Sequence, residues 1–168
     1  MAREEERFDI VTEAGEVIGA ASRSRCHRDP SLLHRAVHLF VFDEGGRVFL
    51  QRRSVQKDIQ PGKWDTSVGG HLQQGESVEQ ALRREMAEEL GLDPSLPVEL
   101  LHEYVWRLPV ESELVRTYRC TCAGPFSLQA DEIDEGRFFC AQELFDLSEA
   151  GQLTPNLEHE LRRLGLLP

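Results

Sequence analysis

Short segments in which apolar and polar residues alternate run through most of this chain, and such alternation is typical of β-strands with one buried face. Two pairs of these segments flank glycine-containing turns, and each pair predicts a β-hairpin: residues 8–11 with 16–21, and residues 36–42 with 47–51. Further strands are predicted at residues 67–68, 100–106, 114–121 and 137–140. Residues 109–113 form the predicted turn between the two longer ones.

One segment follows the period of a helix instead. Its apolar residues recur at every fourth position, at Val78, Leu82, Met86 and Leu90. Ser77 and Gln80 have the spacing of a capping box, in which each side chain bonds the backbone N–H of the other residue. Gly91 suits the left-handed conformation that ends many helices, and Pro94 prevents continuation soon after. These signals predict an amphipathic helix with one face directed towards a core.

Two more helices are predicted near the C-terminus, at residues 141–148 and 156–164, the second ending at Gly165. Strands with helices distributed between them indicate an α/β fold with a mixed β-sheet that is covered on both sides. No internal repeat, low-complexity stretch or linker is visible in the 168 residues. A single domain over residues 1–168 is therefore expected.

The first helix carries a concentration of charge, since Arg84, Glu85, Glu88 and Glu89 fall within six consecutive residues. On a helix, positions i, i+3 and i+4 share one face, so the three carboxylates repel one another. Arg84 neutralises only part of this charge. A Mg²⁺ ion with oxygen ligands, bound also to substrate phosphates, fits the rest. The alternative for a Glu-rich amphipathic helix is an ordinary solvated face.

The segment from residue 70 to residue 92 resembles the Nudix box, G-x5-E-x7-R-E-U-x-E-E-x-G-U, where U is an apolar residue. All nine constrained positions match, at Gly70, Glu76, Arg84, Glu85, Met86, Glu88, Glu89, Gly91 and Leu92. The resemblance implies a Nudix α/β/α sandwich and hydrolysis of a phosphoanhydride bond in a nucleoside diphosphate linked to another moiety, or in a similar organic diphosphate. It also implies Mg²⁺, with Mn²⁺ as an alternative, held by Glu85, Glu88, Glu89 and the carbonyl of Gly70.

The resemblance extends to isopentenyl-diphosphate isomerases and their Nudix relatives over roughly residues 8–140, in the runs 33–36, 40–42, 51–54, 61–64 and 67–71. Isomerases of that group hold a divalent metal with three His and two Glu. The matching residues here are His27, His34, His71, Glu111 and Glu113. A second metal site is therefore implied, whereas each of these residues taken alone is more often solvated or structural. The other histidines are interpreted as structural: His38, His102 and His159.

Two departures from the isomerases favour hydrolysis. Their cysteine, which moves a proton at carbon, is replaced here by Gly69, which has no side chain. Isomerases also commonly lose carboxylates of the box, and this chain keeps Glu85, Glu88 and Glu89. Two competing hypotheses stay open, an isomerase-type enzyme and a non-catalytic Nudix module that binds a diphosphate.

The Nudix interpretation assigns roles to individual side chains. Glu88 and Glu113 are the candidate general bases, with Glu111 behind them. Arg84 is expected to orient the carboxylates by a salt bridge, and Glu76 is a weaker candidate for the metal shell.

Three further residues are candidates for contact with the substrate. Arg53 and Lys57 match isomerase residues that contact diphosphate, and the alternative for both is a solvated loop. Trp64 either stacks on a flat group or packs in the core.

The formal net charge of −11 and the pI near 5.0 disfavour a nucleic-acid polymer as partner, but a small diphosphate can be met by a metal and a few local cations. No run approaches 18 apolar residues and residues 1–7 are mostly charged, so neither a membrane span nor a signal peptide is expected. The cytoplasm is the expected compartment. The four cysteines form no C-x2-C pair, and Cys120 and Cys122 are expected to pack as small apolar residues rather than bind metal. The substrate and the oligomeric state stay open.

Overall fold

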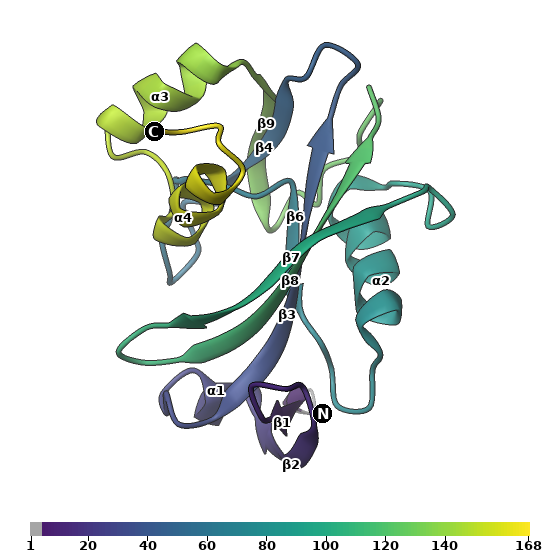
Figure 1. Cartoon of the computed structure of the whole chain (residues 1–168), viewed down its shortest axis with the longest axis vertical. Helices are drawn as coiled ribbons and strands as arrows, with labels where there is room; N and C mark the ends of the chain where they lie inside the picture. Colours follow the sequence, from purple (N-terminus) through teal and green to yellow (C-terminus); the bar gives the residue numbers. More distant parts are fainter. Residues whose placement is uncertain (1–4) are drawn as a thin grey trace.

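A computed structural model describes residues 5–168 as one mixed β-sheet of nine strands with helices on both sides (Figure 1). The strands are β1 (Arg7–Val11), β2 (Val17–Ser22), β3 (Leu33–Phe42), β4 (Val48–Arg53), β5 (Trp64–Asp65), β6 (Val68–His71), β7 (Glu99–Arg107), β8 (Ser112–Thr121) and β9 (Ile133–Phe139). The helices are α1 (Arg23–Cys26), α2 (Val78–Leu90), α3 (Ala141–Glu149) and α4 (Pro155–Arg163). Residues 1–4 lie outside the described residues. They belong to the N-terminal segment, residues 1–7, for which no signal peptide is expected.

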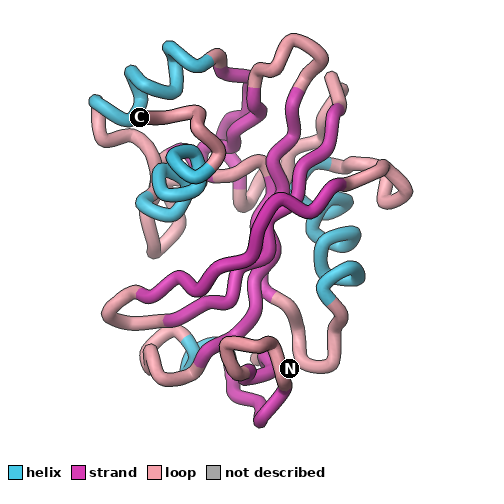
Figure 2. Tube along the Cα trace, in the orientation of Figure 1, coloured by secondary structure: helices cyan, strands magenta, loops and turns pink. Residues whose placement is uncertain are grey.

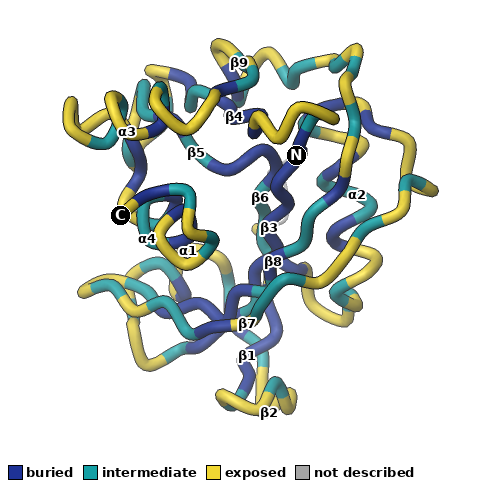
Figure 3. The backbone as a smooth tube through the Cα atoms, turned by 45° about the horizontal axis from the view of Figure 1, so that its top comes forward, coloured by how far each residue is buried: buried dark blue, intermediate teal, exposed yellow. Residues whose placement is uncertain are grey.

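The long strand β3 organises the sheet. It pairs in parallel with β8 over its whole length and antiparallel with β1, β4 and β6. Of its residues only Arg35 is more than slightly accessible, as expected for a strand covered on both faces. Figure 3 shows β3 and much of β8 as the buried centre of the molecule.

Successive side chains of β3 point to opposite faces of the sheet, and each face packs on a different helix layer. Val37, Leu39 and Val41 lie in one core cluster with Leu82 and Met86 of α2. The alternate residues of β3 lie in a second cluster with α3 and α4, and it comprises Phe40, Phe42, Val48, Leu50, Trp64, Phe139, Leu144, Leu153, Leu157, Leu161 and Leu167. The two helix layers lie on opposite sides of the strands in Figure 2. The predicted α/β sandwich with a mixed sheet is confirmed.

The signals at the ends of α2 act as predicted. Ser77 and Gln80 form the capping box, with Ser77 Oγ accepting from the Gln80 N–H and Gln80 Oε1 accepting from the Ser77 N–H. Gly91 ends the helix with a φ of 63°, a left-handed conformation that costs glycine little. Both predicted hairpins are present as antiparallel pairs, β1 with β2 and β3 with β4.

Some sequence-based expectations need correction. The strand β8 begins at Ser112, so Glu113 lies on a strand and not in the predicted turn. The short elements α1 and β5 were not predicted, because four and two residues leave no periodic pattern. Trp64 packs in the core rather than standing free for a ligand.

The expected packing of two cysteines agrees with the structure. Cys120 packs in the cluster beneath α2 with Cys122 against it, as expected. Within residues 5–168, the structure contains no helix that is long and apolar enough to cross a membrane.

Candidate active site

The four-residue strand β6 is the meeting point of the predicted site residues. Its pairing with β3 places Gly69 opposite His38, Gly70 opposite Val37 and His71 opposite Ala36. A Cβ at Gly70 would stand 2.7 Å from Glu85 Cγ and would overlap the carboxyl group itself. Any larger residue at position 70 would therefore push the carboxyl group of Glu85 away from the backbone against which it lies.

Arg84 connects the start of α2 with β6. Its guanidinium binds both oxygens of Glu76, at 2.8 and 2.9 Å, and donates to Glu85 Oε1 at 2.6 Å. A further bond of 3.1 Å reaches the carbonyl oxygen of His71. Glu88 lies at 3.4 Å from the same guanidinium and is about half exposed. Bidentate pairing fixes the plane of the arginine, which in turn fixes the position of Glu85. The structure thus uses Glu76 to hold Arg84.

Glu89 is held against the other glycine of β6. Its Oε2 accepts from Gln51 Nε2 at 2.7 Å and from the backbone N–H of Gly69 at 3.2 Å. Burial, reinforced by the charge of Glu85, raises the pKa of Glu89 to about 8. Burial also raises the pKa of Glu85, although Arg84 works in the opposite direction. Glu85 and Glu89 thus both resist ionisation, and a cation bound between them would relieve the electrostatic repulsion.

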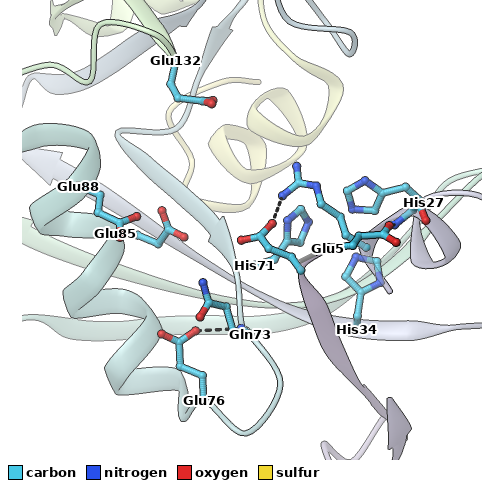
Figure 4. Close-up of polar contacts among 12 residues, drawn as sticks. Glu5, His27, His34, His71, Gln73, Glu76, Glu85, Glu88 and Glu132 are labelled. Atoms are coloured by element: carbon cyan, nitrogen blue, oxygen red, sulfur yellow. Dashed lines mark hydrogen bonds and ion pairs between the residues drawn. The ribbon is translucent and has the colours of Figure 1, made fainter. Parts of the chain in front are cut away.

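A second cluster lies beside the first, and Figure 4 shows its three histidines. His27 follows α1, His34 is on β3 and His71 is on β6, while Glu113 is on β8 and Glu111 in the turn before it. Ligand atoms of His27, His34, His71 and Glu111 all lie within 4.8 Å of one another. Glu111 Oε2 stands 3.4 Å from His27 Nε2 and 4.0 Å from His34 Nε2. Glu113 Oε1 lies 2.7 Å from His71 Nε2 and 3.9 Å from His34 Nε2. The structure therefore brings together all five residues that the isomerase resemblance implied.

The polar atoms of this cluster are poorly satisfied by the protein. Three buried atoms of the cluster have no hydrogen-bond partner among residues 5–168: His27 Nε2, His34 Nε2 and Glu111 Oε2. His34 Nδ1 lies 3.2 Å from the carbonyl of Leu32, which orients the ring and leaves Nε2 directed at the cluster. Such atoms are costly unless a ligand satisfies them, and neutral imidazoles with carboxylates are suitable ligands for a transition metal.

The electrostatics of the cluster fit the same donor set. Burial, reinforced by His71, lowers the pKa of His27 to about 4, and burial also lowers the pKa of His34. Burial opposes ionisation of Glu113, but the hydrogen bond from His71 outweighs it and the pKa of Glu113 falls to about 2. Burial and the charge of Glu113 raise the pKa of Glu111. At neutral pH, His27 and His34 are therefore uncharged and Glu113 is ionised, as metal ligands must be.

The sequence of the whole chain identifies the family that these sites belong to. A model of the NUDIX domain matches residues 32–163, well over half of the chain. The chain belongs to the Nudix family. Its relatives include an uncharacterized Nudix hydrolase of Yersinia pestis, 36% identical over 155 residues that make up 90% of this chain and 81% of the relative. An isopentenyl-diphosphate Delta-isomerase of Streptomyces avermitilis is 37% identical over 142 residues, covering 82% of this chain and 72% of the isomerase.

Among solved structures, the DR0079 protein of Deinococcus radiodurans is similar to this Nudix protein over its full fold. The TM-score is 0.82 and the sequences are 28% identical, with 94% of this chain and 98% of that chain covered. A family member with this fold and an intact box has the architecture of a Nudix hydrolase.

The two predicted phosphate ligands of this Nudix protein are engaged with carboxylates. Arg53 donates to Asp65 Oδ2 at 3.1 Å and to the carbonyl of Ile59 at 3.0 Å. Lys57 pairs with Glu132. A phosphate would therefore have to compete with these carboxylates for both cations.

One cation near the site escaped prediction. Arg23 of the short helix α1 pairs with Glu6 at 2.8 Å, and both side chains are nearly half exposed. Its carbonyl oxygen accepts from the backbone N–H of His27 at 3.0 Å, so Arg23 lies near the cluster. Its charge also contributes, behind burial, to the lowered pKa of His27 and of Lys57. Arg23 is recognised as a cation near the site only from the location of α1, and no sequence pattern indicated that helix.

Proposed function

We propose that this Nudix protein is a Mg²⁺-dependent hydrolase that cleaves the phosphoanhydride bond of a nucleoside diphosphate linked to another moiety, or of a similar organic diphosphate. The observation that carries the proposal is the partly buried pair Glu85 and Glu89, packed on Gly69 and Gly70 of β6. Their raised pKa values mark a site with more negative charge than Arg84 neutralises.

The roles of the side chains follow from their positions. Glu85, Glu88, Glu89 and the carbonyl of Gly70 would hold Mg²⁺, which supplies a Lewis acid for the phosphates and an activated water when bound. Arg84 keeps Glu85 in place through its bonds to both α2 and β6. These carboxylates are a hard oxygen donor set, which suits Mg²⁺ and also Mn²⁺.

Glu88 of the Nudix box is a better candidate for the general base than Glu113, which lies downstream of the box. A carboxylate whose pKa is lowered to about 2 accepts a proton poorly, which weakens the case for Glu113. Glu88 is about half exposed and lies 3.4 Å from Arg84, so it can meet a water without disturbing Glu85 and Glu89. We therefore assign Glu88 as the base. Arg53 and Lys57 are proposed to bind phosphate once their carboxylate partners are displaced.

A second candidate function is an isomerase-type reaction on an organic diphosphate. It is favoured by the assembled cluster of three His and two Glu, which we propose holds a second metal, and by the isomerases among the relatives. It is disfavoured by Gly69, because a residue without a side chain cannot move a proton at carbon. A non-catalytic diphosphate-binding module, the third candidate, has no comparable reason to keep three box carboxylates.

The experiment is a Mg²⁺-dependent screen over a panel of diphosphates, with released phosphate and nucleotide as the products measured. Glu89→Gln is expected to lower turnover by at least about 100-fold, because it removes a charged metal ligand. Glu79→Gln is the matched control, since Glu79 is on the same helix but its side chain is 80% exposed. It should retain activity within about twofold.

Each outcome of the screen assigns one of the three functions. Glu89→Gln should fold normally, because burial already favours the uncharged form at position 89. Full activity of Glu89→Gln would refute the assignment of the metal site. Conversion of an allylic isomer with no phosphate released would support the isomerase, and tight diphosphate binding without any turnover would support the binding module.

A further inference from the structure

A buried ion pair lies directly under β6, outside both candidate metal sites. His38 of β3 is 8% exposed, and its Nδ1 lies 2.8 Å from Glu160 Oε1 of α4. Glu160 is fully buried and also accepts hydrogen bonds from Thr117 Oγ1, at 2.8 Å, and from the hydroxyl of Tyr104. The three bonds hold Glu160 Oε1 in place, and the carboxylate in turn orients the imidazole. Sequence analysis alone would assign His38 only a structural role.

The other edge of the His38 ring borders Gly69. A Cβ built at Gly69 would stand 3.2 Å from His38 Cδ2 and 3.6 Å from His38 Nε2, with Thr66 Oγ1 also at 3.2 Å. Gly69 itself is partly exposed. The absence of a side chain at position 69 therefore leaves the Nε2 edge of His38 next to a surface that solvent reaches.

That surface lies between the two candidate metal sites. Gly69 gives its backbone N–H to Glu89 of the box. His71, two residues further along β6, points to the same face of the sheet as a side chain at Gly69 would, and it belongs to the second cluster. A diphosphate bound at the box carboxylates would lie next to this surface, because Glu89 is bonded to the backbone of Gly69.

The ion pair also gives His38 the charge that such a contact needs. Burial disfavours the charged ring, but the carboxylate of Glu160 outweighs it and raises the pKa of His38 to about 9. The pKa of Glu160 is lowered by His38 and by its hydrogen-bond donors, although burial works against ionisation. With both groups charged, Nδ1 donates to Glu160 and Nε2 carries a second proton that it can donate.

We propose that His38 contacts the substrate, donating a hydrogen bond from Nε2 to a phosphoryl oxygen of the diphosphate bound over Gly69, while Glu160 holds the ring in position. The inference rests on the proposed function for the location of the diphosphate. It adds a charge-assisted donor that comes from the sheet rather than from the box or the loops.

Two substitutions at His38 separate this role from that of a helix anchor. In His38→Asn the amide nitrogen takes the place of Nδ1, so the bond to Glu160 is kept and the donor over Gly69 is lost. In His38→Gln the amide nitrogen takes the place of Nε2, so the donor is kept and the bond to Glu160 is lost. Substrate contact predicts that His38→Asn binds diphosphate about 10- to 100-fold more weakly, while His38→Gln stays closer to wild type in binding and loses thermal stability. A purely structural role predicts the opposite order, with His38→Asn indistinguishable from wild type.

The probe is methylenediphosphonate with Mg²⁺, because this diphosphate is not hydrolysed. Its affinity is measured by calorimetry for wild type and both variants, and the ¹⁵N signal of His38 Nε2, assigned by its loss in His38→Asn, is followed in labelled protein. The inference requires that this signal shift on binding and that the affinity of His38→Asn fall. An unmoved signal at saturation, unchanged affinity of His38→Asn, or no binding by wild type at millimolar probe would each overturn it.

These measurements involve no turnover, so they can fail or succeed independently of the diphosphate screen. A shifted His38 signal together with a silent screen would refute hydrolysis and retain His38 as a diphosphate ligand. Turnover lost in Glu89→Gln together with an unmoved His38 signal would support hydrolysis and refute the role of His38.

Discussion

Addition of Zn²⁺ to metal-free protein should raise its thermal unfolding temperature through the cluster of three His and two Glu. Buried His27 Nε2, His34 Nε2 and Glu111 Oε2 have no partner among residues 5–168, and each such atom costs about 1–3 kcal/mol. A metal bound to all three removes that cost. Saturation at 100 times the dissociation constant stabilises a folded protein by about 2.7 kcal/mol. For a chain of this size each kcal/mol corresponds to about 2–4 °C, so a rise of about 5–11 °C is expected.

Differential scanning calorimetry after dialysis against a chelator measures this rise. Mg²⁺ should give a smaller rise than Zn²⁺, since imidazole ligands suit Zn²⁺ and Mg²⁺ prefers oxygen. His34→Gln should abolish the response to Zn²⁺, because His34 is fully buried and its Nε2 faces the cluster. His159→Gln is the matched control, as His159 packs on the rings of Tyr104 and Trp106 and is not one of the ligand residues of the cluster, and it should respond like wild type. A wild-type unfolding temperature that Zn²⁺ leaves unchanged, or a full response in His34→Gln, would refute the metal site.

Two other perturbations test the contacts around β6. Arg84→Lys should lower kcat about 10- to 100-fold at unchanged stability, because one ammonium cannot bind Glu76 at two oxygens and Glu85 at once. Steady-state kinetics measure this effect, and activity within twofold of wild type would contradict it. Glu160→Gln removes the carboxylate that raises the pKa of His38 from 6.5 to about 9. Each pKa unit is worth about 1.4 kcal/mol, so the substitution should lower the free energy of unfolding by about 3 kcal/mol between pH 5 and pH 6.5. A raised folded-state pKa stabilises fully below the unfolded value of 6.5, and this stabilisation is lost as the pH rises to the folded value of about 9. The difference between the two proteins should therefore shrink from pH 6.5 upwards and be nearly gone above pH 9. Urea titrations that show a pH-independent difference would contradict the charged pair.

The parts of the fold that the sequence predicted are those with local signals. The helix α2 was predicted with its capping box and its left-handed Gly91, because each signal involves residues a few positions apart. The hairpins β1–β2 and β3–β4 were predicted for the same reason, since a turn and its flanking alternation lie in one short segment. The match to the box then predicted that Glu85 and Glu89 lie close to the glycines of the strand that precedes the helix.

The parts that were missed depend on contacts between distant segments. Glu113 was assigned to a turn because its surroundings are polar, and only the pairing of β8 with β3 places it beside His34. Arg23 lies on a helical turn of four residues that has no periodicity. The pair of His38 and Glu160 joins residues 122 positions apart, and no local pattern indicates such a contact.

The glycine at position 69 lies between the box and the buried ion pair of His38 and Glu160. Its backbone N–H bonds Glu89, and a Cβ there would stand 3.2 Å from both the His38 ring and Thr66 Oγ1. A side chain at this position would therefore have to push the ring, which Glu160 holds, aside by a few tenths of an ångström. Without a side chain, position 69 has no group that could move a proton at carbon, and the charged edge of His38 borders it instead. This arrangement suits an anionic phosphoryl group and does not suit proton transfer at carbon.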